Sequence, residues 1–402
     1  MKSERLNKLF FHGKANFKGN YILRVSESIP KIGIGPQEQC LIISKKNSSF
    51  VSTKRANAYK VLVILKEVED SIRTKNSKII ILSENPDLCD GDIIEIVSDG
   101  KEARVVVLYR IGSDDNAIII TNACNNKCIM CPEPMLRPNK VNFNLNRIKK
   151  IIKLIDKKTT NIGISGGEPT LIKQDLIRIL SIFRKNIPNT QLSLITNGRM
   201  FYYKSFVEAI KNVNNKNLLI CVPLHSQSEE IHDEITQVKG SFSETHQGIK
   251  NLLEASQRIE LRIVIQKNNY KELELLAEYI KSNYFGVYRV VFLGMEMSGI
   301  ARYNLDKIWV NYKNIQPYLE KALISLLASG IQVNIFNIPL CKIADPFRRL
   351  VSNSISDYKI RYLQECDVCS LKQVCGGSFV STLDLVRNEG VIPINESNPI
   401  QL

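Results

Sequence analysis

Six short apolar runs alternate with stretches of helical period between residues 116 and 310 of this chain. The runs are "AIIIT" (117–121), "NIGIS" (161–165), "LSLIT" (192–196), "LLICVPL" (218–224), "LRIVI" (261–265) and "RVVFLG" (289–294). Strands that are separated by helical crossovers predict a parallel α/β sheet or barrel. In such folds the loops that follow the carboxyl ends of the strands carry the active site.

The two flanks of this region have different patterns. Residues 1–115 contain Val/Ile runs broken by turn residues, and the last two runs read as a hairpin that turns at Ser98-Asp99-Gly100. Residues 311–402 contain one helical segment, one strand ("IQVNIFNI") and a tail that bears cysteines. We therefore predict a β-rich domain over 1–115, an α/β core over 116–310 and a C-terminal extension over 311–402.

Composition excludes several classes of protein. The 402 residues are 44% hydrophobic and 24% charged, as in a globular protein that buries a core. No apolar run is long enough to span a membrane, and the N-terminus lacks the apolar stretch and cleavage site of a secretory signal. We therefore expect a cytoplasmic protein whose clustered cysteines bind metal or perform chemistry rather than form disulfides.

The formal net charge of +15 fits either a nucleic-acid or acidic-peptide partner, or solvated basic faces. The basic residues are spread along the chain. For this reason we favour the second interpretation and expect neither a nucleic-acid nor a membrane partner.

Three cysteines follow the first strand of the α/β region, in the stretch "TNACNNKCIMCPEP". Cys124, Cys128 and Cys131 have the spacing CxxxCxxC, and thiolates are preferred ligands of iron–sulfur clusters and zinc. A structural zinc site is closed by four ligands, but the next cysteine along the chain is Cys221. Three protein ligands leave one metal position open, which is typical of a catalytic site.

The second strand ends in "GISGGEPTL". Gly166 and Gly167 remove side chains where something must approach the backbone closely, Glu168 offers a carboxylate, and Pro169 stiffens the exit. Alone this segment would be read as an ordinary turn from strand to helix. Together with the three cysteines on the neighbouring strand, it indicates a site.

CxxxCxxC after the first strand and GGEP after the second resemble the radical S-adenosylmethionine (SAM) superfamily. The resemblance implies that Cys124, Cys128 and Cys131 hold a [4Fe–4S] cluster whose open iron binds SAM. It also implies a partial barrel of six strands and six helices. In that family Glu168 and the backbone of Gly166 and Gly167 would receive the ammonium group of SAM.

The resemblance extends to less specific positions in the SAM pocket. Ser226 is the candidate for a ribose contact, or else it caps the segment that follows it. Met130 stands where the family often has an aromatic residue against adenine. For the carboxylate of SAM, Lys239 or Arg262 could replace a missing arginine, and Gln266 either reaches the pocket or faces solvent. The cofactor-binding candidates are Met130, Gly166, Gly167, Glu168, Pro169, Thr196, Asn197, Ser226, Arg262 and Gln266.

Four more cysteines lie in the C-terminal extension: Cys341, Cys366, Cys369 and Cys375. Four thiolates can close one site completely, and zinc is one possible occupant. Resemblance to the SPASM and twitch extensions of radical SAM peptide maturases implies an auxiliary [4Fe–4S] cluster instead. The remaining thiols, of Cys40, Cys89 and Cys221, stand alone and are interpreted as core or incidental residues.

Segments such as "LGMEMSGIARYN", "SNSISDYKIRYLQECDVC" and "VCGGSF" resemble one subgroup, the radical SAM maturase C of His-Xaa-Ser peptide-modification systems. This implies an enzyme that cleaves SAM to a 5′-deoxyadenosyl radical, takes a hydrogen atom from a ribosomally made precursor peptide, and works with an electron donor and a partner maturase. Cross-linking is one possible outcome of such an oxidation. Two alternatives stay open: a radical SAM enzyme that acts on RNA, and a non-catalytic metal-bearing scaffold that binds the peptide. The N-terminal domain would bind a leader peptide or support the barrel.

Overall fold

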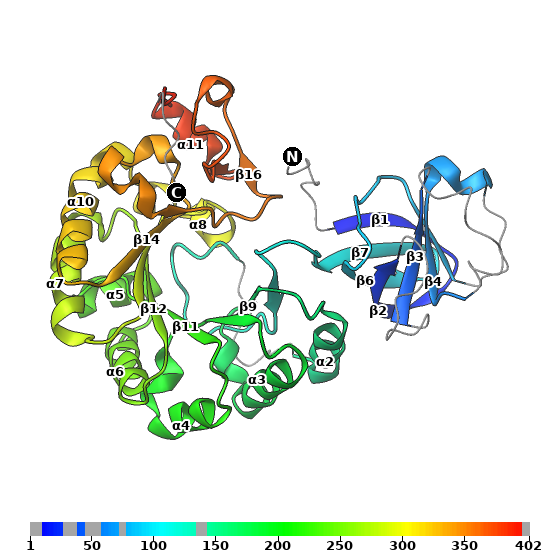
Figure 1. The fold of residues 1–402 in the computed structure, drawn as a ribbon, viewed down its shortest axis with the longest axis horizontal. Helices are drawn as coiled ribbons and strands as arrows, with labels where there is room; N and C mark the ends of the chain where they lie inside the picture. Colours follow the sequence, from blue (N-terminus) through cyan, green and yellow to red (C-terminus); the bar gives the residue numbers. More distant parts are fainter. Residues whose placement is uncertain (1–9, 27–37, 45–57, 72–77, 134–142, 396–402) are drawn as a thin grey trace. The chain divides into compact units, whose positions relative to one another are not determined.

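A computed structural model describes residues 10–26, 38–44, 58–71, 78–133 and 143–395. The chain divides into two compact units, coloured along the sequence in Figure 1. The first comprises Met1–Ile118, Asn144–Gly163 and Arg178–Gln191, and the second comprises Ile119–Phe143, Ile164–Ile177 and Leu192–Leu402. Across the part of the chain that is described, no helix is long and apolar enough to cross a membrane.

Seven strands near the N-terminus close into a barrel in the order β1-β5-β4-β3-β2-β6-β7. The strands are β1 (Phe10–Ala15), β2 (Lys18–Ser26), β3 (Gln39–Ile43), β4 (Val61–Leu65), β5 (Ile79–Leu82), β6 (Ile93–Asp99) and β7 (Glu102–Tyr109), and the 3-10 helix η3 (Lys66–Ser71) follows β4. The predicted hairpin forms between β6 and β7, which pair from Ile93↔Tyr109 to Ser98↔Ala103. The β-rich character predicted for this part of the chain is confirmed.

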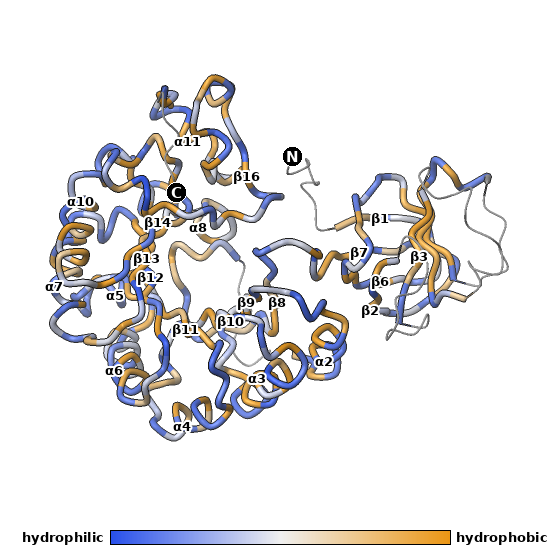
Figure 2. The backbone as a smooth tube through the Cα atoms, in the orientation of Figure 1, coloured by the Kyte–Doolittle hydropathy of each residue, from blue (hydrophilic) through white to orange (hydrophobic). Residues whose placement is uncertain are grey.

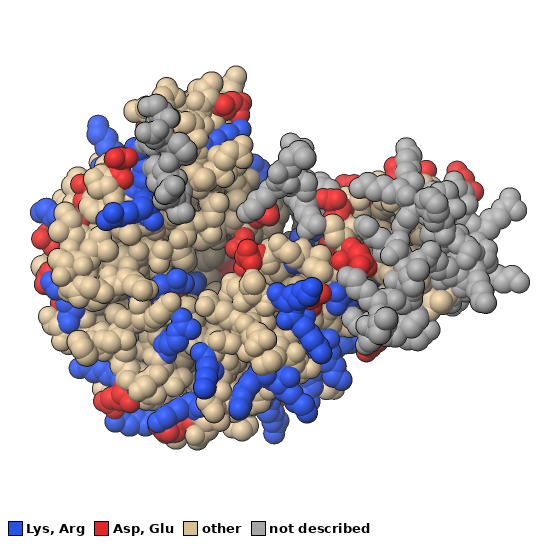
Figure 3. Space-filling model, in the orientation of Figure 1, with Lys and Arg blue, Asp and Glu red and all other residues tan. Residues whose placement is uncertain are grey.

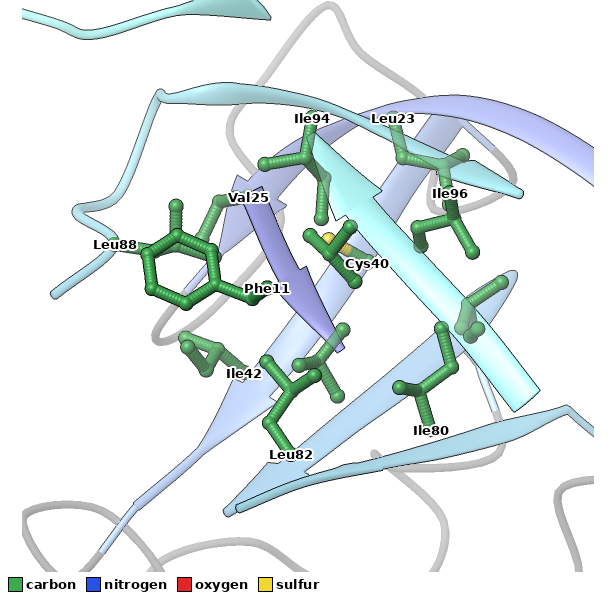
Figure 4. Close-up of a cluster of buried hydrophobic side chains, with 14 of the residues drawn as sticks. Phe11, Leu23, Val25, Cys40, Ile42, Ile80, Leu82, Leu88, Ile94 and Ile96 are labelled. Atoms are coloured by element: carbon green, nitrogen blue, oxygen red, sulfur yellow. The ribbon is translucent and has the colours of Figure 1, made fainter. Parts of the chain in front are cut away.

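The barrel is filled from alternate positions of its strands, as Figure 4 shows for Phe11, Val25, Cys40 and Ile94. Cys40 is fully buried here, and burial raises the pKa of its thiol to about 12. It is a core residue, as predicted from its isolated position in an apolar run. The outward side chains of β3 and β4 are also buried, in a second cluster of Leu41, Ile43, Tyr59, Leu62, Ile64 and Val68.

The six predicted α/β strands all form, and they lie in one eight-stranded sheet in sequence order from β8 to β15. They are β8 (Ala117–Ile119), β9 (Asn161–Ser165), β10 (Gln191–Ile195), β11 (Leu218–Pro223), β12 (Ile259–Val264) and β13 (Arg289–Leu293). The predicted strand "IQVNIFNI" is β14 (Gln332–Phe336), which pairs in parallel with β13, and β15 (Val351–Ser352) pairs with β14. The sheet is a partial barrel of parallel strands, as the resemblance implies, and it has eight strands where six were expected.

Helices connect these strands, and their apolar stripes are visible in Figure 2. They are α2 (Leu145–Leu154), α3 (Gln174–Asn186), α4 (Lys204–Asn212), α5 (Glu229–Thr236), α6 (Ser241–Glu254), α7 (Leu273–Asn283), α8 (Gly299–Tyr303), α9 (Leu305–Ile308), α10 (Tyr312–Ala328) and α11 (Leu383–Asn388). α2 begins at Asn144, whose side chain accepts a hydrogen bond from the Arg147 N–H, and it buries Ile148, Ile151 and Ile152. On the face in Figure 3, lysines and arginines are interspersed with acidic residues over the helices.

Because neighbouring strands of the sheet are parallel, their carboxyl ends meet at one edge. The segments that follow β8, β9, β10, β11 and β12 therefore begin at this edge, and they include every predicted SAM-binding position except Arg262, which lies within β12. Of these strands, β11 has five consecutive buried residues, Leu218–Val222, which is typical of a parallel strand covered on both faces.

Candidate functional site

The loop that carries Cys124, Cys128 and Cys131 runs directly from the end of β8. Its backbone is held from one side, because the N–H groups of Lys127 and Ile129 donate to the carbonyls of Thr236 and Ile235, at 2.9 and 3.0 Å. This attaches the loop to the last turn of α5. The sequence predicted the loop but not this support.

The three thiols lie near one another and are largely withdrawn from solvent. Burial raises the pKa of Cys124 to about 11 and that of Cys128 to about 12. Nearby Glu168 and Cys131 also raise the pKa of Cys124, and nearby Cys124 and Cys131 raise that of Cys128. Thiols in this state become good ligands when a metal replaces the proton. Within the described ranges, no three His, Cys, Asp or Glu side chains are set around a single metal ion.

The glycines of GGEP allow two loops to lie against each other. Gly167 N–H donates to the Thr121 carbonyl and Glu168 N–H to the Ala123 carbonyl, both at 2.7 Å. A Cβ atom on Gly166 would lie 2.2 Å from the Thr121 oxygen, and one on Gly167 would lie 2.3 Å from the Ala123 oxygen. The close approach predicted for these glycines is therefore made by the chain itself, next to Cys124.

The carboxylate of Glu168 is fully buried and faces protein donors. Its Oε1 accepts from the Thr170 N–H (2.9 Å), the Thr170 hydroxyl (2.5 Å) and the Thr196 hydroxyl (2.7 Å), and its Oε2 accepts from the Asn197 N–H (2.5 Å). Burial raises its pKa, while these donors oppose the rise. Glu168 thus joins the loop after β9 to the loop after β10, and it caps the 3-10 helix η4 (Pro169–Ile172).

In the same segment, the carbonyls of Gly166 and Gly167 accept no hydrogen bond from the described residues. They are acceptors beside the thiols, where the resemblance places the ammonium group of SAM.

Arg199 is a site residue that the sequence reasoning missed. Its Nη1 donates to the Asn125 carbonyl (2.7 Å) and to Asn126 Oδ1 (2.8 Å), and its Nε donates to Glu244 Oε2 (2.5 Å). Asn197 Nδ2 also donates to Asn125 Oδ1, at 2.7 Å. The end of β10 therefore holds the two asparagines between the first two cysteines. The sequence signal that could have found Arg199 is its place in "ITNGR", two residues after the predicted cofactor-binding residue Asn197.

Gln266, which follows β12, has a side-chain amide that lacks hydrogen-bond partners among the described residues. Its side chain is fully buried, and neither Oε1 nor Nε2 has a hydrogen-bond partner among the residues that the structure describes. The alternative that Gln266 faces solvent is therefore wrong. A buried amide without partners is costly, and it indicates a missing ligand or water.

His225, which follows β11, also has a buried polar atom without a described partner, and the sequence did not predict it as a site residue. It is 1% exposed, its Nδ1 has no hydrogen-bond partner in the described part of the chain, and burial lowers its pKa well below the ordinary value. Asn269 fixes both residues, since its Nδ2 donates to the His225 carbonyl (2.8 Å) and its Oδ1 accepts from the Gln266 N–H (2.9 Å). Three orphaned polar atoms therefore lie on adjacent parallel strands.

Other predicted positions are engaged with the protein. The buried Ser226 accepts the Ser228 N–H at 3.0 Å, and the residue that caps α5 is Ser228, whose side chain accepts from the Ile231 N–H. Arg262 Nε donates to Glu260 Oε1 at 2.5 Å. Met130 packs against an apolar cluster that includes Met295 and Met297. Lys239 is exposed before α6.

The second group of thiols also comes together. Cys341, Cys366, Cys369 and Cys375 line one pocket, with apolar residues from Leu340 to Ile394. Burial raises the pKa of Cys341 to about 11, and the other three thiols raise it further. Two of these sulfurs accept backbone N–H groups, Cys375 Sγ from Gly377 (3.4 Å) and Cys369 Sγ from Ile394 (3.5 Å).

Secondary structure around this pocket is sparse. It comprises the 3-10 helices η7 (Leu340–Lys342), η8 (Asp345–Leu350) and η9 (Gln364–Val368), and the short antiparallel pair of β16 (Ile360–Arg361) and β17 (Ser378–Phe379). Two thiols that the sequence assigns to neither group lie elsewhere. Cys221 is buried in β11, and Cys89 is half-buried.

Comparisons with known proteins address the same region. Residues 118–280 match the model of the radical SAM superfamily. The chain is 28% identical over 163 residues to a GTP 3′,8-cyclase of Petrotoga mobilis, covering 39% of this chain and 49% of that protein. It is 26% identical over 162 residues to the sporulation killing factor maturation protein SkfB of Bacillus subtilis, covering 40% and 37%. The chain thus spans about half or less of the length of these relatives.

Solved structures with a similar arrangement include SuiB of Streptococcus suis bound to its precursor peptide SuiA, with 17% identity and a TM-score of 0.44 over 60% of this chain and 53% of that one. Another is anSMEcpe with bound AdoMet and a peptide, with 14% identity and a TM-score of 0.48 over 69% and 92%. The family model, the CxxxCxxC loop and the GGEP turn agree on one assignment. This chain contains a radical SAM domain, which residues 118–280 carry.

Proposed function

We propose that this protein is a radical SAM enzyme that modifies a ribosomally made precursor peptide. The observation that carries the proposal is the buried amide of Gln266, which has no hydrogen-bond partner among the described residues and lies at the sheet edge from which the loop with the three cysteines begins. These residues fit the two cofactors of the family. Three thiolates leave one position of a [4Fe–4S] cluster open, and the orphaned polar atoms require a ligand with both donors and acceptors.

Each group of residues then has a distinct role. The carbonyls of Gly166 and Gly167 would accept the ammonium group of SAM, and the amide of Gln266 would donate to and accept from the rest of the molecule. Glu168, Thr196 and Asn197 would hold the loops in register rather than contact SAM through the carboxylate. When bound, the cluster and SAM supply a 5′-deoxyadenosyl radical that can take a hydrogen atom from a substrate.

The four C-terminal thiols would hold an auxiliary [4Fe–4S] cluster. Their apolar pocket and the N–H groups that point at Cys369 and Cys375 are features that stabilise a buried cluster. Four thiolates leave no open position, so this group would transfer electrons rather than bind SAM. Zinc is the competing occupant, and iron and sulfide counts would distinguish the two.

Two relatives favour a peptide substrate. They are the maturation protein SkfB and the subtilosin biosynthesis protein AlbA of Bacillus subtilis, the second 24% identical over 163 residues. The subgroup resemblance narrows the substrate to a precursor with His-Xaa-Ser repeats, handled with a partner maturase and oxidised by hydrogen abstraction. The GTP 3′,8-cyclases match over 163 and 192 residues, which favours a nucleotide substrate as the second candidate.

The test is anaerobic reconstitution, followed by co-incubation with SAM, dithionite and a candidate precursor. The proposal predicts iron and sulfide for two clusters, release of 5′-deoxyadenosine, and a mass change in the peptide. A mass change in GTP or RNA instead of peptide would replace the substrate assignment. Full peptide binding without any SAM cleavage would make the protein a non-catalytic scaffold and end the proposal.

A further inference from the structure

The two faces of the parallel sheet differ in polarity. Along β12, Leu261 and Ile263 are apolar and fully buried, and helices such as α6 and α7 lie on the outer side of these strands (Figure 1). Successive side chains of a strand point to opposite faces, so Glu260, Arg262 and Val264 belong to the inner face of the partial barrel. Because Arg262 and Val264 are only partly buried, the inner face is less completely covered than the outer one.

The register of the strands gathers charged side chains on this inner face. Glu260 lies opposite Cys221 of β11 on one side and opposite Arg289 of β13 on the other, so these three residues form one row across the sheet. Arg262 follows two residues later on β12 and therefore belongs to the same face. Two guanidinium groups and one carboxylate thus meet here, and positive charge is in excess.

Glu260 binds both arginines through its completely buried carboxylate. Arg262 Nε donates to Glu260 Oε1 at 2.5 Å, and Arg289 donates to Glu260 Oε2 through Nε and Nη2, both at 2.5 Å. Burial alone would raise the pKa of this carboxyl, but the two guanidinium groups outweigh that effect and lower the pKa. The carboxylate is therefore ionised, and it holds both arginines in place.

The guanidinium of Arg262 keeps an unused edge. Glu260 takes its Nε, and the Cys221 thiol is its other polar neighbour. Neither Nη1 nor Nη2 donates to an oxygen atom of the described residues, although the side chain is 21% exposed. The planar fork of an arginine matches a carboxylate with two parallel hydrogen bonds. Arg262 therefore presents a fixed anion-binding edge to the inside of the partial barrel.

We propose that Arg262, held by Glu260 and Arg289, binds a carboxylate of the peptide substrate inside the partial barrel. The inference rests on the proposed function and narrows its substrate to a peptide that carries an Asp or Glu side chain, or its C-terminal carboxylate, near the residue that is modified. Arg262 precedes Gln266 by four residues, so at most about 14 Å of chain separate the two. A peptide anchored at Arg262 can therefore extend to the edge where the proposed function places SAM.

The test measures binding of the candidate precursor to the anaerobically reconstituted protein. The peptide is made in three forms: unaltered, with every Asp and Glu changed to Asn or Gln, and with an amidated C-terminus. The protein variants are Arg262→Gln and Arg262→Lys, and the control is Lys211→Gln, which removes one positive charge from an exposed position of α4. If Arg262→Gln fails to fold, the double variant Glu260→Gln/Arg262→Gln, which removes both charges of the pair, replaces it.

We expect Arg262→Gln to bind the unaltered precursor about tenfold more weakly, since a hydrogen-bonded charge pair is lost. Arg262→Lys recovers part of the affinity, because lysine keeps the charge without the planar fork. Lys211→Gln binds the peptide as wild type does, and titration shows the same SAM affinity in every variant. One of the two neutralised peptides binds wild type about tenfold more weakly and is insensitive to Arg262→Gln, which identifies the carboxylate as side-chain or C-terminal.

Unchanged binding of the unaltered precursor to Arg262→Gln, equal sensitivity of all three peptide forms, or a loss of SAM affinity in place of peptide affinity would each overturn the inference. Loss of GTP binding with peptide binding retained would make the anion a nucleotide phosphate and would also overturn it. These measurements need no catalysis. Peptide binding that depends on Arg262, in a protein that never cleaves SAM, would support the inference and refute the proposed function.

Discussion

Glu168 illustrates how one buried carboxylate can join the loops of a candidate site. Its carboxylate accepts four hydrogen bonds from Thr170, Thr196 and Asn197, and it is inaccessible to solvent. The GGEP motif predicted that Glu168 belongs to the site, but the sequence alone does not give the direction of its side chain. The hydrogen bonds between loops show that the carboxylate holds its neighbours in place, while no described residue donates to the carbonyls of Gly166 and Gly167.

Gly167→Ala tests whether close contact of the two loops is required. A methyl group there would meet the Ala123 carbonyl at 2.3 Å, so we expect destabilisation of about 1–3 kcal/mol and weaker SAM binding. Isothermal titration of SAM and denaturant unfolding measure both. Gly330→Ala is the control for general destabilisation, because a φ of +76° strains any side chain there while no described atom lies within 4 Å, so it should lower stability and keep the SAM affinity. Wild-type SAM affinity in Gly167→Ala would contradict the account.

Arg199→Ala tests the support of the cysteine loop. The change removes two donors from Asn125 and Asn126, so the loop should hold iron less tightly. We expect iron loss during buffer exchange to be several-fold faster, with partial rescue in Arg199→Lys, which keeps the charge but not the planar fork. Lys204→Ala, whose exposed ion pair with Glu254 lies outside the loop, is the control. Unchanged iron retention in Arg199→Ala would show that the contact is incidental.

His232 gives the protein a pH dependence. Burial lowers its pKa from 6.5 to about 3, and its Nδ1 accepts the His225 N–H at 3.3 Å. Between these values the unfolded chain binds a proton that the folded chain does not, so stability falls as pH drops below about 6.5. The contribution of this one group is about 1 kcal/mol at pH 5.5.

Urea unfolding of wild type and His232→Gln at pH 7.5 and 5.5 measures this contribution. The variant, which cannot titrate at this position, should lose about 1 kcal/mol less than wild type over that interval. An identical loss in both proteins would assign the dependence to other groups.

At the scale of elements, the strands were predictable because each is a short apolar run bounded by turn residues. "NIGIS" corresponds to β9 residue for residue, and "LSLIT" to β10 within one residue. The partnership of β14 with β13 was not predictable, because Gln332–Phe336 reads as an isolated strand and its neighbour is set by packing across the whole sheet. The same is true of His225, whose carbonyl meets Asn269 only when β11 and β12 lie side by side.

The segment "SISDYK" has a structural role that the sequence could not supply. Lys359 Nζ lies 2.9 Å from Glu296 Oε1, and this ion pair joins the segment near β16 to the loop after β13. Glu296→Gln should therefore loosen residues 351–380, because a partly buried lysine loses its counter-charge. Hydrogen exchange followed by mass spectrometry should show faster exchange in residues 351–380 of the variant and an unchanged exchange rate in β11. Exchange that is unchanged, or faster throughout the chain, would refute this role.

The N-terminal barrel constrains its own possible role. Its seven strands close on themselves, so the described strands present no free edge for strand addition by a peptide. Two ion pairs join it to the segment around α2, Arg24–Asp156 at 3.2 Å and Arg147–Glu95 at 2.7 Å. These contacts favour support of the α/β fold over leader binding by β-augmentation.

For the whole molecule, the central claim is that three thiols and the sheet edge beside them bind and cleave SAM. Cleavage of SAM by the anaerobically reconstituted protein with dithionite tests it most directly, in wild type, Cys128→Ala and Cys89→Ala, whose thiol lies outside both groups. We predict 5′-deoxyadenosine from wild type and Cys89→Ala and none from Cys128→Ala, which should keep the iron of the C-terminal group. Equal cleavage by Cys128→Ala, or no cleavage by wild type even with precursor present, would contradict the account.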